Sequence, residues 1–238
     1  LVGCHNHPSA MTLQQGIQMS CNPYFFNVFK RIINQNKSTS NFKDSEIGLG
    51  TWQKHVMSFG LGKPLELDLP DMKGGRVPGI KYYDKIYGNG RWAFSTIYSL
   101  SIGQGEIELI PLQMANLSAT IANRGFYFTP HLVRSVNTKA GNTPEKYLEK
   151  HFTTVDSSHF NIIIEGMRRV VQESGGTARQ ARIDSIIVCG KTGTVETTSG
   201  RDHSVFMAFA PMENPKIAIS VYTENAGFGG AVSAPIAS

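Results

Sequence analysis

Three short apolar runs near the C-terminal end constrain the fold more than any other feature of the chain. They cover residues 186–195, 204–210 and 217–223, and their residues are β-branched or alternate between apolar and polar. Turn residues separate them: Thr197-Thr198-Ser199-Gly200 and Met212-Glu213-Asn214-Pro215. Connections this short favour antiparallel pairing, because parallel strands need a crossover of a dozen or more residues. The runs therefore predict a three-stranded antiparallel meander.

Helical signals dominate the chain before these strands. Thr12 and Gln15 form the pattern of a capping box that starts a helix over residues 13–19. Asn22 and Pro23 predict an N-cap and a first helical residue, and the apolar residues after them predict a core helix. Helices that precede an antiparallel sheet indicate an α+β fold in which the helices pack against the sheet.

Three more helices and two irregular stretches complete the predicted order. The helices are expected over residues 51–57, from Pro111 to a stop at Gly125, and over residues 160–171. Residues 34–46 are polar, and residues 61–95 are rich in Gly, Pro and aromatic residues, so both stretches are predicted to be irregular. A long irregular stretch of this kind often lines a binding site.

Charge and hydropathy exclude several classes of function. The 23 Lys and Arg residues outnumber the 18 Asp and Glu residues, but they are scattered along the chain. No basic run is present of the kind that binds nucleic acid or a lipid surface, so no nucleic-acid partner is expected. No stretch approaches the ~20 apolar residues of a membrane-spanning helix, and the first residues do not form a signal peptide. If the protein is exported, we expect its targeting segment outside these residues.

The three cysteines, Cys4, Cys21 and Cys189, are too few and too widely spaced for a disulfide scaffold. Cys4, His5, His7 and Cys21 are of metal-ligand type, but the segment from Cys4 to His7 does not have zinc-finger spacing. A metal there would need further ligands from upstream. Two interpretations stay open: a metal near Cys4 and His7, or a small buried cysteine beside surface histidines.

The sharpest motif, Lys191-Thr192-Gly193-Thr194, lies in the first predicted strand. The lysine supplies a fixed cation and the threonines supply hydroxyl donors, while Gly193 lets a ligand backbone approach closely. A strand edge of this composition can pair with an extended peptide and hold its terminal carboxylate. The alternative is an ordinary strand that ends in a polar turn.

A second motif, Ser20-Cys21-Asn22, lies at the corner between the first two predicted helices. Taken alone, it can be no more than a helix terminus and a helix cap. The penicillin-recognising acyl-transfer enzymes, however, combine Ser-x-x-Lys with Ser-Asp-Asn and Lys-Thr-Gly. The Ser20-x-Asn22 corner and the Lys191-Thr192-Gly193 run match the second and third of these motifs in order.

With further blocks, these motifs make the chain resemble the class B penicillin-binding proteins, in particular their elongation-type branch. The matching blocks run almost end to end: Ser20-Cys21-Asn22-Pro23-Tyr24-Phe25, Phe59-Gly60-Leu61-Gly62-Lys63, Gly103-Gln104-Gly105, Pro111-Leu112-Gln113, Asn123-Arg124-Gly125, Gly175-Gly176-Thr177-Ala178, Asp202-His203-Ser204 and Glu224-Asn225-Ala226-Gly227-Phe228-Gly229-Gly230. The resemblance implies the transpeptidase fold shared with serine β-lactamases, with an antiparallel sheet packed between helices. It also implies that residues 1–238 are the C-terminal majority of a single transpeptidase domain, incomplete at both ends.

The chain departs from the family pattern in two places. Glu66 stands where family members usually carry glycine. The Ser-x-x-Lys motif, which in the family opens a buried helix well before the Ser-x-Asn corner, is missing, so we expect the nucleophilic serine upstream of residue 1. A literal match, Ser40-Asn41-Phe42-Lys43, follows the corner and falls in a predicted polar loop. Such a loop would not hold a nucleophile rigidly against its base, and we interpret this match as a coincidence.

The resemblance implies a two-step acyl transfer. A serine attacks the carbonyl between two terminal D-alanines of a peptidoglycan stem peptide, and the acyl group then passes to an amine of a neighbouring stem. Ser20 would relay a proton, Lys191 would orient Ser20, and Asn22 would bind the substrate backbone. Thr192 and Thr194 would hold the terminal carboxylate, and the Thr194 N–H would form half of the oxyanion hole. β-Lactam antibiotics would acylate the same serine, no cofactor is implied, and the 238-residue chain alone is expected to be inactive.

The resemblance further implies an anchor in the inner membrane, a domain on the periplasmic face, and partners in the elongation machinery that include a membrane glycosyltransferase. A serine β-lactamase or a β-lactam-sensing receptor shares the fold but lacks the elongation-type blocks. A non-catalytic cell-wall assembly scaffold would not need Ser20, Asn22 or the Lys-Thr-Gly run. Asp202-His203-Ser204 suggests a catalytic triad, but neighbours on a strand point to opposite faces, so we expect His203 to support the strand.

Overall fold

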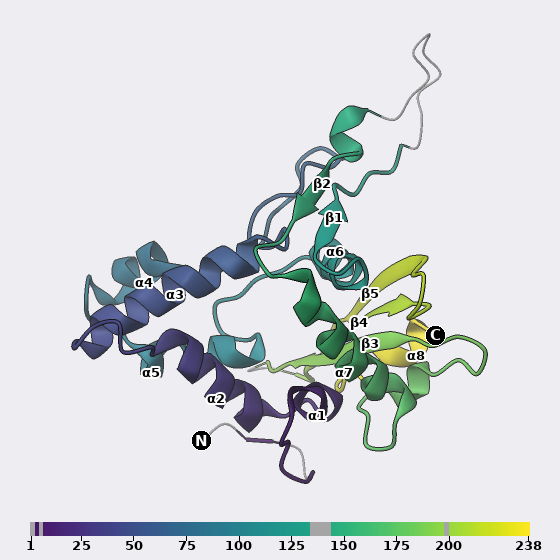
Figure 1. The fold of residues 1–238 in the computed structure, drawn as a ribbon, viewed down its shortest axis with the longest axis horizontal. Helices are drawn as coiled ribbons and strands as arrows, with labels where there is room; N and C mark the ends of the chain where they lie inside the picture. The colour runs from purple at the N-terminus through teal and green to yellow at the C-terminus, as the bar shows by residue number, and fades with distance from the viewer. Residues whose placement is uncertain (1–2, 5–6, 134–143, 198–199) are drawn as a thin grey trace.

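Helices come first and the main sheet comes last in the computed structural model, which describes residues 3–4, 7–133, 144–197 and 200–238 (Figure 1). The α-helices are α1 (Leu13–Gln18), α2 (Asn22–Ile33), α3 (Asn41–Met57), α4 (Ile80–Tyr87), α5 (Phe94–Ile97), α6 (Pro111–Ala122), α7 (Phe160–Gln172) and α8 (Ser233–Ile236). The 3₁₀ helices are η1 (Tyr98–Ile102), η2 (Glu145–Tyr147), η3 (Ser157–His159) and η4 (Arg179–Ala181). The strands are β1 (Phe126–Phe128), β2 (Lys150–Phe152), β3 (Cys189–Val195), β4 (His203–Ala210) and β5 (Ile217–Thr223). Within the described ranges, no helix is long and apolar enough to cross a membrane.

The main sheet has the strand order β3-β4-β5 and both pairings are antiparallel, which confirms the predicted meander. Cys189 pairs with Phe209, and Ser204 pairs with Thr223. The first strand begins at Cys189 and not at residue 186. Residues 204–209 of β4 are all buried although alternate residues point to opposite faces, so the sheet is covered on both faces. β3 forms one edge of this sheet, and this edge borders the candidate site.

The larger core joins α1, α6 and α7 to the sheet (Figure 1). Its buried members include Ile164, Met167 and Val170 of α7, together with Phe206 and Phe209 of β4. α8 contacts β4 and β5, and its Ser233 hydroxyl donates to the Ser204 carbonyl at 2.9 Å. The core thus fixes β3 and the α1–α2 corner relative to one another.

A second core lies among α2, α3, α4 and the α5–η1 segment. Its buried residues are apolar or aromatic: Phe29, Ile33, Leu49, Tyr83, Trp92, Ile97 and Leu100. The Trp92 Nε1–H donates to Asp84 at 2.8 Å, which satisfies the only polar group of that buried ring. This core anchors η1, from which the chain continues into the candidate site.

The helix predicted over residues 51–57 is confirmed and ends at Met57, but its start is wrong, because α3 begins at Asn41. The predicted irregular stretch over residues 34–46 is therefore wrong from Asn41 on. Ser40 is the N-cap, and Asp44 turns inward to accept hydrogen bonds from the backbone N–H groups of Asn36 and Lys37 at 3.1 and 2.7 Å. Polar residues on the buried face of α3 therefore hid its helical character.

Other local predictions need smaller corrections. The stretch over residues 61–95 contains α4 (Ile80–Tyr87), whose C-cap is Gly88. The N-cap of α2 is Cys21, so Asn22 is already helical. α6 ends at Ala122, and the first left-handed residue after it is Arg124 (φ 59°), one residue before the predicted Gly125. The predicted capping box at α1 is confirmed. Thr198 and Ser199 of the predicted turn lie outside the described residues.

Candidate active site

The six residues predicted for the site line one cleft of about 1130 Å³. Its walls come from the α1–α2 corner, β3, the η1 segment, residues 176–180, the loop that follows β5 and residues 3–4 near the N-terminus. The predicted residues that line it are Ser20, Asn22, Lys191, Thr192, Gly193 and Thr194. The fold therefore brings together two motifs that stand far apart in the sequence.

Ser20 and Lys191 are in direct contact although 171 positions separate them. The Lys191 Nζ donates to the Ser20 Oγ at 2.7 Å and to the Thr192 carbonyl at 2.8 Å. Burial lowers the pKa of Lys191 from 10.5 to about 8, because few water molecules can solvate the charged form. An amine with this pKa can hold or release a proton near neutral pH, as a proton relay requires.

Ser20 has a left-handed backbone conformation, with φ of 54°. It ends α1: its N–H donates to the Ile17 carbonyl, and the N–H of Cys21 donates to the Gly16 carbonyl at 2.9 Å. Glycine is the usual residue at such a helix end, because a side chain costs about 1 kcal/mol or more there. A non-glycine residue in this conformation carries backbone strain, and strained residues of this kind cluster at functional sites.

The outer edge of β3 presents the backbone of Thr194 to the cleft. The Thr194 carbonyl accepts from the Gln104 Nε2 at 3.1 Å, and Gln104 lies on the cleft side of the strand. In an antiparallel ladder the N–H and C=O of one residue point to the same side, so the Thr194 N–H also faces the cleft. This is the position that an oxyanion-hole donor requires.

The threonine hydroxyls of β3 have fixed partners. Thr192 Oγ1 lies 2.8 Å from Thr177 Oγ1, and Thr194 Oγ1 accepts from the Gly229 N–H at 3.4 Å. Gly229 approaches so closely that a Cβ there would lie 2.4 Å from the Gly193 carbonyl oxygen. The loop after β5 therefore has to carry glycine at this position, and it holds the threonines in place.

Asn22 lines the cleft from the first turn of α2, and its Nδ2 donates to the Gly3 carbonyl at 3.0 Å. This bond ties the N-terminal segment to the corner that carries Ser20. The predicted role of Asn22 in holding the substrate backbone stays a prediction.

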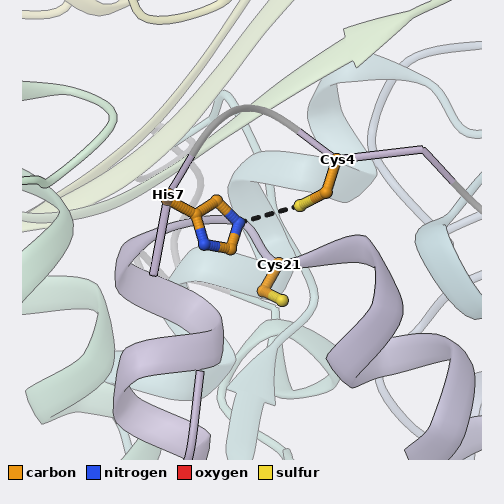
Figure 2. Close-up of side chains that lie close together, drawn as sticks. All are labelled: Cys4, His7 and Cys21. Carbon is orange, nitrogen blue, oxygen red and sulfur yellow. Dashed lines mark hydrogen bonds between the residues drawn. The ribbon is translucent and has the colours of Figure 1, made fainter. Parts of the chain in front are cut away.

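Three residues of metal-ligand type meet beside this corner, as Figure 2 shows. The Cys4 Sγ lies 2.8 Å from the His7 Nε2, and the ligand atoms of Cys4, His7 and Cys21 all lie within 4.8 Å of one another. The His7 Nδ1 lies 2.7 Å from the Pro8 carbonyl, a contact that fits a proton on Nδ1, so Nε2, which faces the Cys4 Sγ, is the nitrogen that could bind a metal.

Thiolate and imidazole ligands suit Zn²⁺, whose tetrahedral site would place such atoms roughly 3.5–3.8 Å apart. Both interpretations left open by the sequence remain: Cys4, His7 and Cys21 lie close enough together to hold a metal, and Cys21 is a small buried cysteine, as the alternative expects. His5, the other candidate ligand, lies outside the described residues.

Comparison with known proteins identifies the family of the chain that forms this cleft. Residues 2–238 match the family described as the penicillin binding protein transpeptidase domain. The chain belongs to this transpeptidase family. The predicted resemblance to penicillin-binding proteins is thereby confirmed.

Relatives and solved structures agree with the family match. Peptidoglycan D,D-transpeptidase MrdA of Haemophilus influenzae is 31% identical over 209 residues, which are 79% of this chain and 31% of that protein. A crystal structure of Pseudomonas aeruginosa PBP2 in complex with WCK 5153 is 28% identical with a TM-score of 0.77, and the match covers 95% of this chain and 45% of that one. A chain of a peptidoglycan synthase complex, described as coordinating polymerization and crosslinking, is 25% identical with a TM-score of 0.73 and coverages of 94% and 36%. The chain spans about a third of the length of the curated relatives that it matches.

Two other residues in sequence patterns that resemble catalytic motifs, His203 and Ser40, do not contribute to the lining of the described cleft. His203 begins β4, and its Nδ1 accepts from the Asn225 N–H at 3.0 Å, which is the supporting contact expected of it. Ser40 caps α3, and the Lys43 Nζ forms an ion pair with Glu46 at 2.8 Å. The loop predicted around Ser40 and Lys43 is a helix start, but neither residue lines the cleft.

Two polar residues of the transpeptidase cleft received no role from the sequence. Gln104 bonds the Thr194 carbonyl, and Thr177 bonds the Thr192 hydroxyl. Both lie in blocks that carry the family resemblance, Gly103-Gln104-Gly105 and Gly175-Gly176-Thr177-Ala178. Their glycine neighbours were the visible signal, but no local pattern indicated which β3 atoms they would reach.

Proposed function

We propose that this chain forms the acyl-transfer site of a peptidoglycan D,D-transpeptidase that cross-links stem peptides through a serine acyl-enzyme. The observation that carries the proposal is the hydrogen bond from Lys191 to Ser20 beside the open edge of β3. The name of the Haemophilus relative, a peptidoglycan D,D-transpeptidase, supports the same reaction. The attacking serine comes from the Ser-x-x-Lys motif that we expect upstream of residue 1.

In the first step the serine oxygen bonds to the carbonyl carbon of the penultimate D-alanine, and the C–N bond to the last D-alanine breaks. The leaving amine needs a proton, and the Ser20 hydroxyl, held by Lys191 at 2.7 Å, lies in the chain of groups that can deliver it. In the second step an amine of a neighbouring stem attacks the ester, loses a proton along the same path, and releases the serine. A covalent intermediate thus divides one difficult exchange into two easier ones.

The edge of β3 orients the acyl donor. The Thr194 N–H points into the cleft, where it would stabilise the negative carbonyl oxygen of each tetrahedral intermediate. The hydroxyls of Thr192 and Thr194 would bind the terminal carboxylate, and the Lys191 ammonium makes the cleft favourable for that anion. β-Lactam antibiotics would enter the same cleft because they carry a comparable carboxylate and a reactive amide.

The family also suggests the setting of the reaction. We place the domain on the periplasmic face of the inner membrane, with its anchor outside these residues. Elongation machinery with a membrane glycosyltransferase would be its partner, an arrangement supported by the similarity to a chain of a peptidoglycan synthase complex.

The test uses the full-length protein with a stem pentapeptide and an acceptor amine. We expect D-alanine release together with a cross-linked product, both lost in Ser20→Ala. Ser101→Ala serves as the matched control, because Ser101 also lines the cleft but its hydroxyl donates to the Tyr98 carbonyl. Steady hydrolysis of a chromogenic β-lactam without cross-linking would favour a β-lactamase, and no product from either substrate would favour a scaffold.

A further inference from the structure

The side chain of Gln104 lies where an extended acyl donor would pair with β3. Its Nε2 donates to the Thr194 carbonyl at 3.1 Å, on the cleft side of the strand. The Gln104 side chain is half-buried there, and within the described part of the chain it makes no hydrogen bond besides this one. A side-chain amide thus occupies an acceptor at the sheet edge that faces the substrate.

Antiparallel pairing shows what this acceptor would otherwise bind. Two residues that face one another in a hydrogen-bonded pair exchange both of their N–H···O bonds. The donor residue whose carbonyl accepts from the Thr194 N–H therefore aims its own N–H at the Thr194 carbonyl. The Gln104 amide has the same chemistry as that peptide N–H and holds its place.

We propose that Gln104 is a specificity-determining residue, which occupies the Thr194 carbonyl until the amide N–H of an acyl donor displaces it. The inference rests on the proposed acyl-transfer function. A donor with a suitable N–H replaces the lost bond, whereas a donor without one leaves Gln104 in place. The contact thereby distinguishes acyl donors by whether they carry this amide.

The displacement needs only rotation of the Gln104 side chain, because the surrounding backbone is held. The Gln104 N–H donates to the Ser99 carbonyl at 3.2 Å, and Leu100 is buried in the second core. The flanking residues Gly103 and Gly105 have φ of 73° and 76°, which form the tight turn that aims Gln104 at the strand.

The experiment compares two β-lactams on the full-length protein by intact-mass kinetics of acylation. Benzylpenicillin carries an acylamino N–H beside its reactive ring, and imipenem carries a hydroxyethyl group in that place. Gln104→Ala should raise the second-order acylation constant of benzylpenicillin about fivefold, the factor expected from one neutral hydrogen bond. The constant for imipenem should change by less than about twofold.

Gln180→Ala is the matched control, because Gln180 is an exposed glutamine of the same cleft. A second variant, Gln104→Met, keeps the side-chain length without the donor and should show the same selectivity if both variants melt like the parent. A fall in both constants would mean that Gln104 supports the strand, and an equal rise in both would mean general loosening; either result overturns the inference. If the parent protein forms no adduct with either compound, the proposed function fails as well, and the two failures are thus distinguishable.

Discussion

Replacing Lys191 with methionine should make the domain more stable while it removes the proton relay. The Lys191 ammonium is held between the Ser20 hydroxyl and the Thr192 carbonyl, where burial lowers its pKa from 10.5 to about 8. Burying a charge without an oppositely charged partner lowers the stability of the fold, and proteins carry such a cost where function needs the charge. Methionine has a similar length and carries no charge, so it removes this cost.

The magnitude follows from the pKa. At pH 7 the amine is protonated in both the folded and unfolded states, and the folded state bears the full cost, about 3 kcal/mol. Between the folded pKa of about 8 and the unfolded pKa of 10.5, the unfolded state binds more protons, so the parent gains stability as the pH rises. The stability advantage of Lys191→Met should therefore shrink by about 2 kcal/mol from pH 7 to about pH 9.5.

Urea unfolding of the parent and of Lys191→Met at both pH values measures this change. Effects of other titrating groups cancel in the difference between the two proteins. Lys85→Met is the control, because Lys85 is exposed on α4 and should give no pH-dependent difference. An advantage of Lys191→Met that stays constant with pH, or a variant less stable than the parent at pH 7, would refute the argument that burial depresses this pKa.

Three further predictions concern strain, metal and acid stability. Ser20→Gly should melt about 2–4 °C above Ser20→Ala, because only glycine adopts φ of 54° without strain; equal melting temperatures would remove the strain argument. The protein should bind one Zn²⁺ through Cys4, His7 and Cys21, and Cys21→Ser should weaken that binding about tenfold or more, as metal titration would measure; unchanged affinity would contradict the site. Two arginines of α7 lower the pKa of Glu165 to about 2, so its contribution to stability is complete above about pH 4.5 and is lost as the pH falls toward 2. Glu165→Gln should flatten acid denaturation over that range, and an unchanged acid profile would show that the ion pairs contribute nothing.

The elements that rest on regular local patterns could be predicted from the sequence. The three C-terminal runs placed β4 and β5 within one residue of their observed ends, because each run is apolar or β-branched and turn residues separate it from the next. The capping box at Thr12 located the start of α1, because its hydrogen bonds join residues only three positions apart in the sequence. The motifs at Ser20 and Lys191 identified the cleft because the family resemblance fixed their order, and the structure brings them to 2.7 Å.

Features that depend on distant partners could not be predicted. Asp44 is buried because backbone N–H groups of the preceding loop satisfy it, and no pattern within α3 shows those partners. Gln104 reaches Thr194 across 90 positions of sequence, and Cys21 meets Cys4 because the corner folds back on the N-terminal segment. Sequence periodicity describes which face is apolar, but not which polar groups a tertiary contact will satisfy.

The most direct test of the acyl-transfer account is the intact mass of the full-length protein, and of the 238-residue chain, after incubation with a labelled penicillin. The account predicts one adduct on the full-length protein, mapped to a serine upstream of residue 1, and none on the short chain. An adduct on Ser40, or on any other serine of these 238 residues, would show that the nucleophile has been misplaced and would contradict the proposed roles of Ser20 and Lys191.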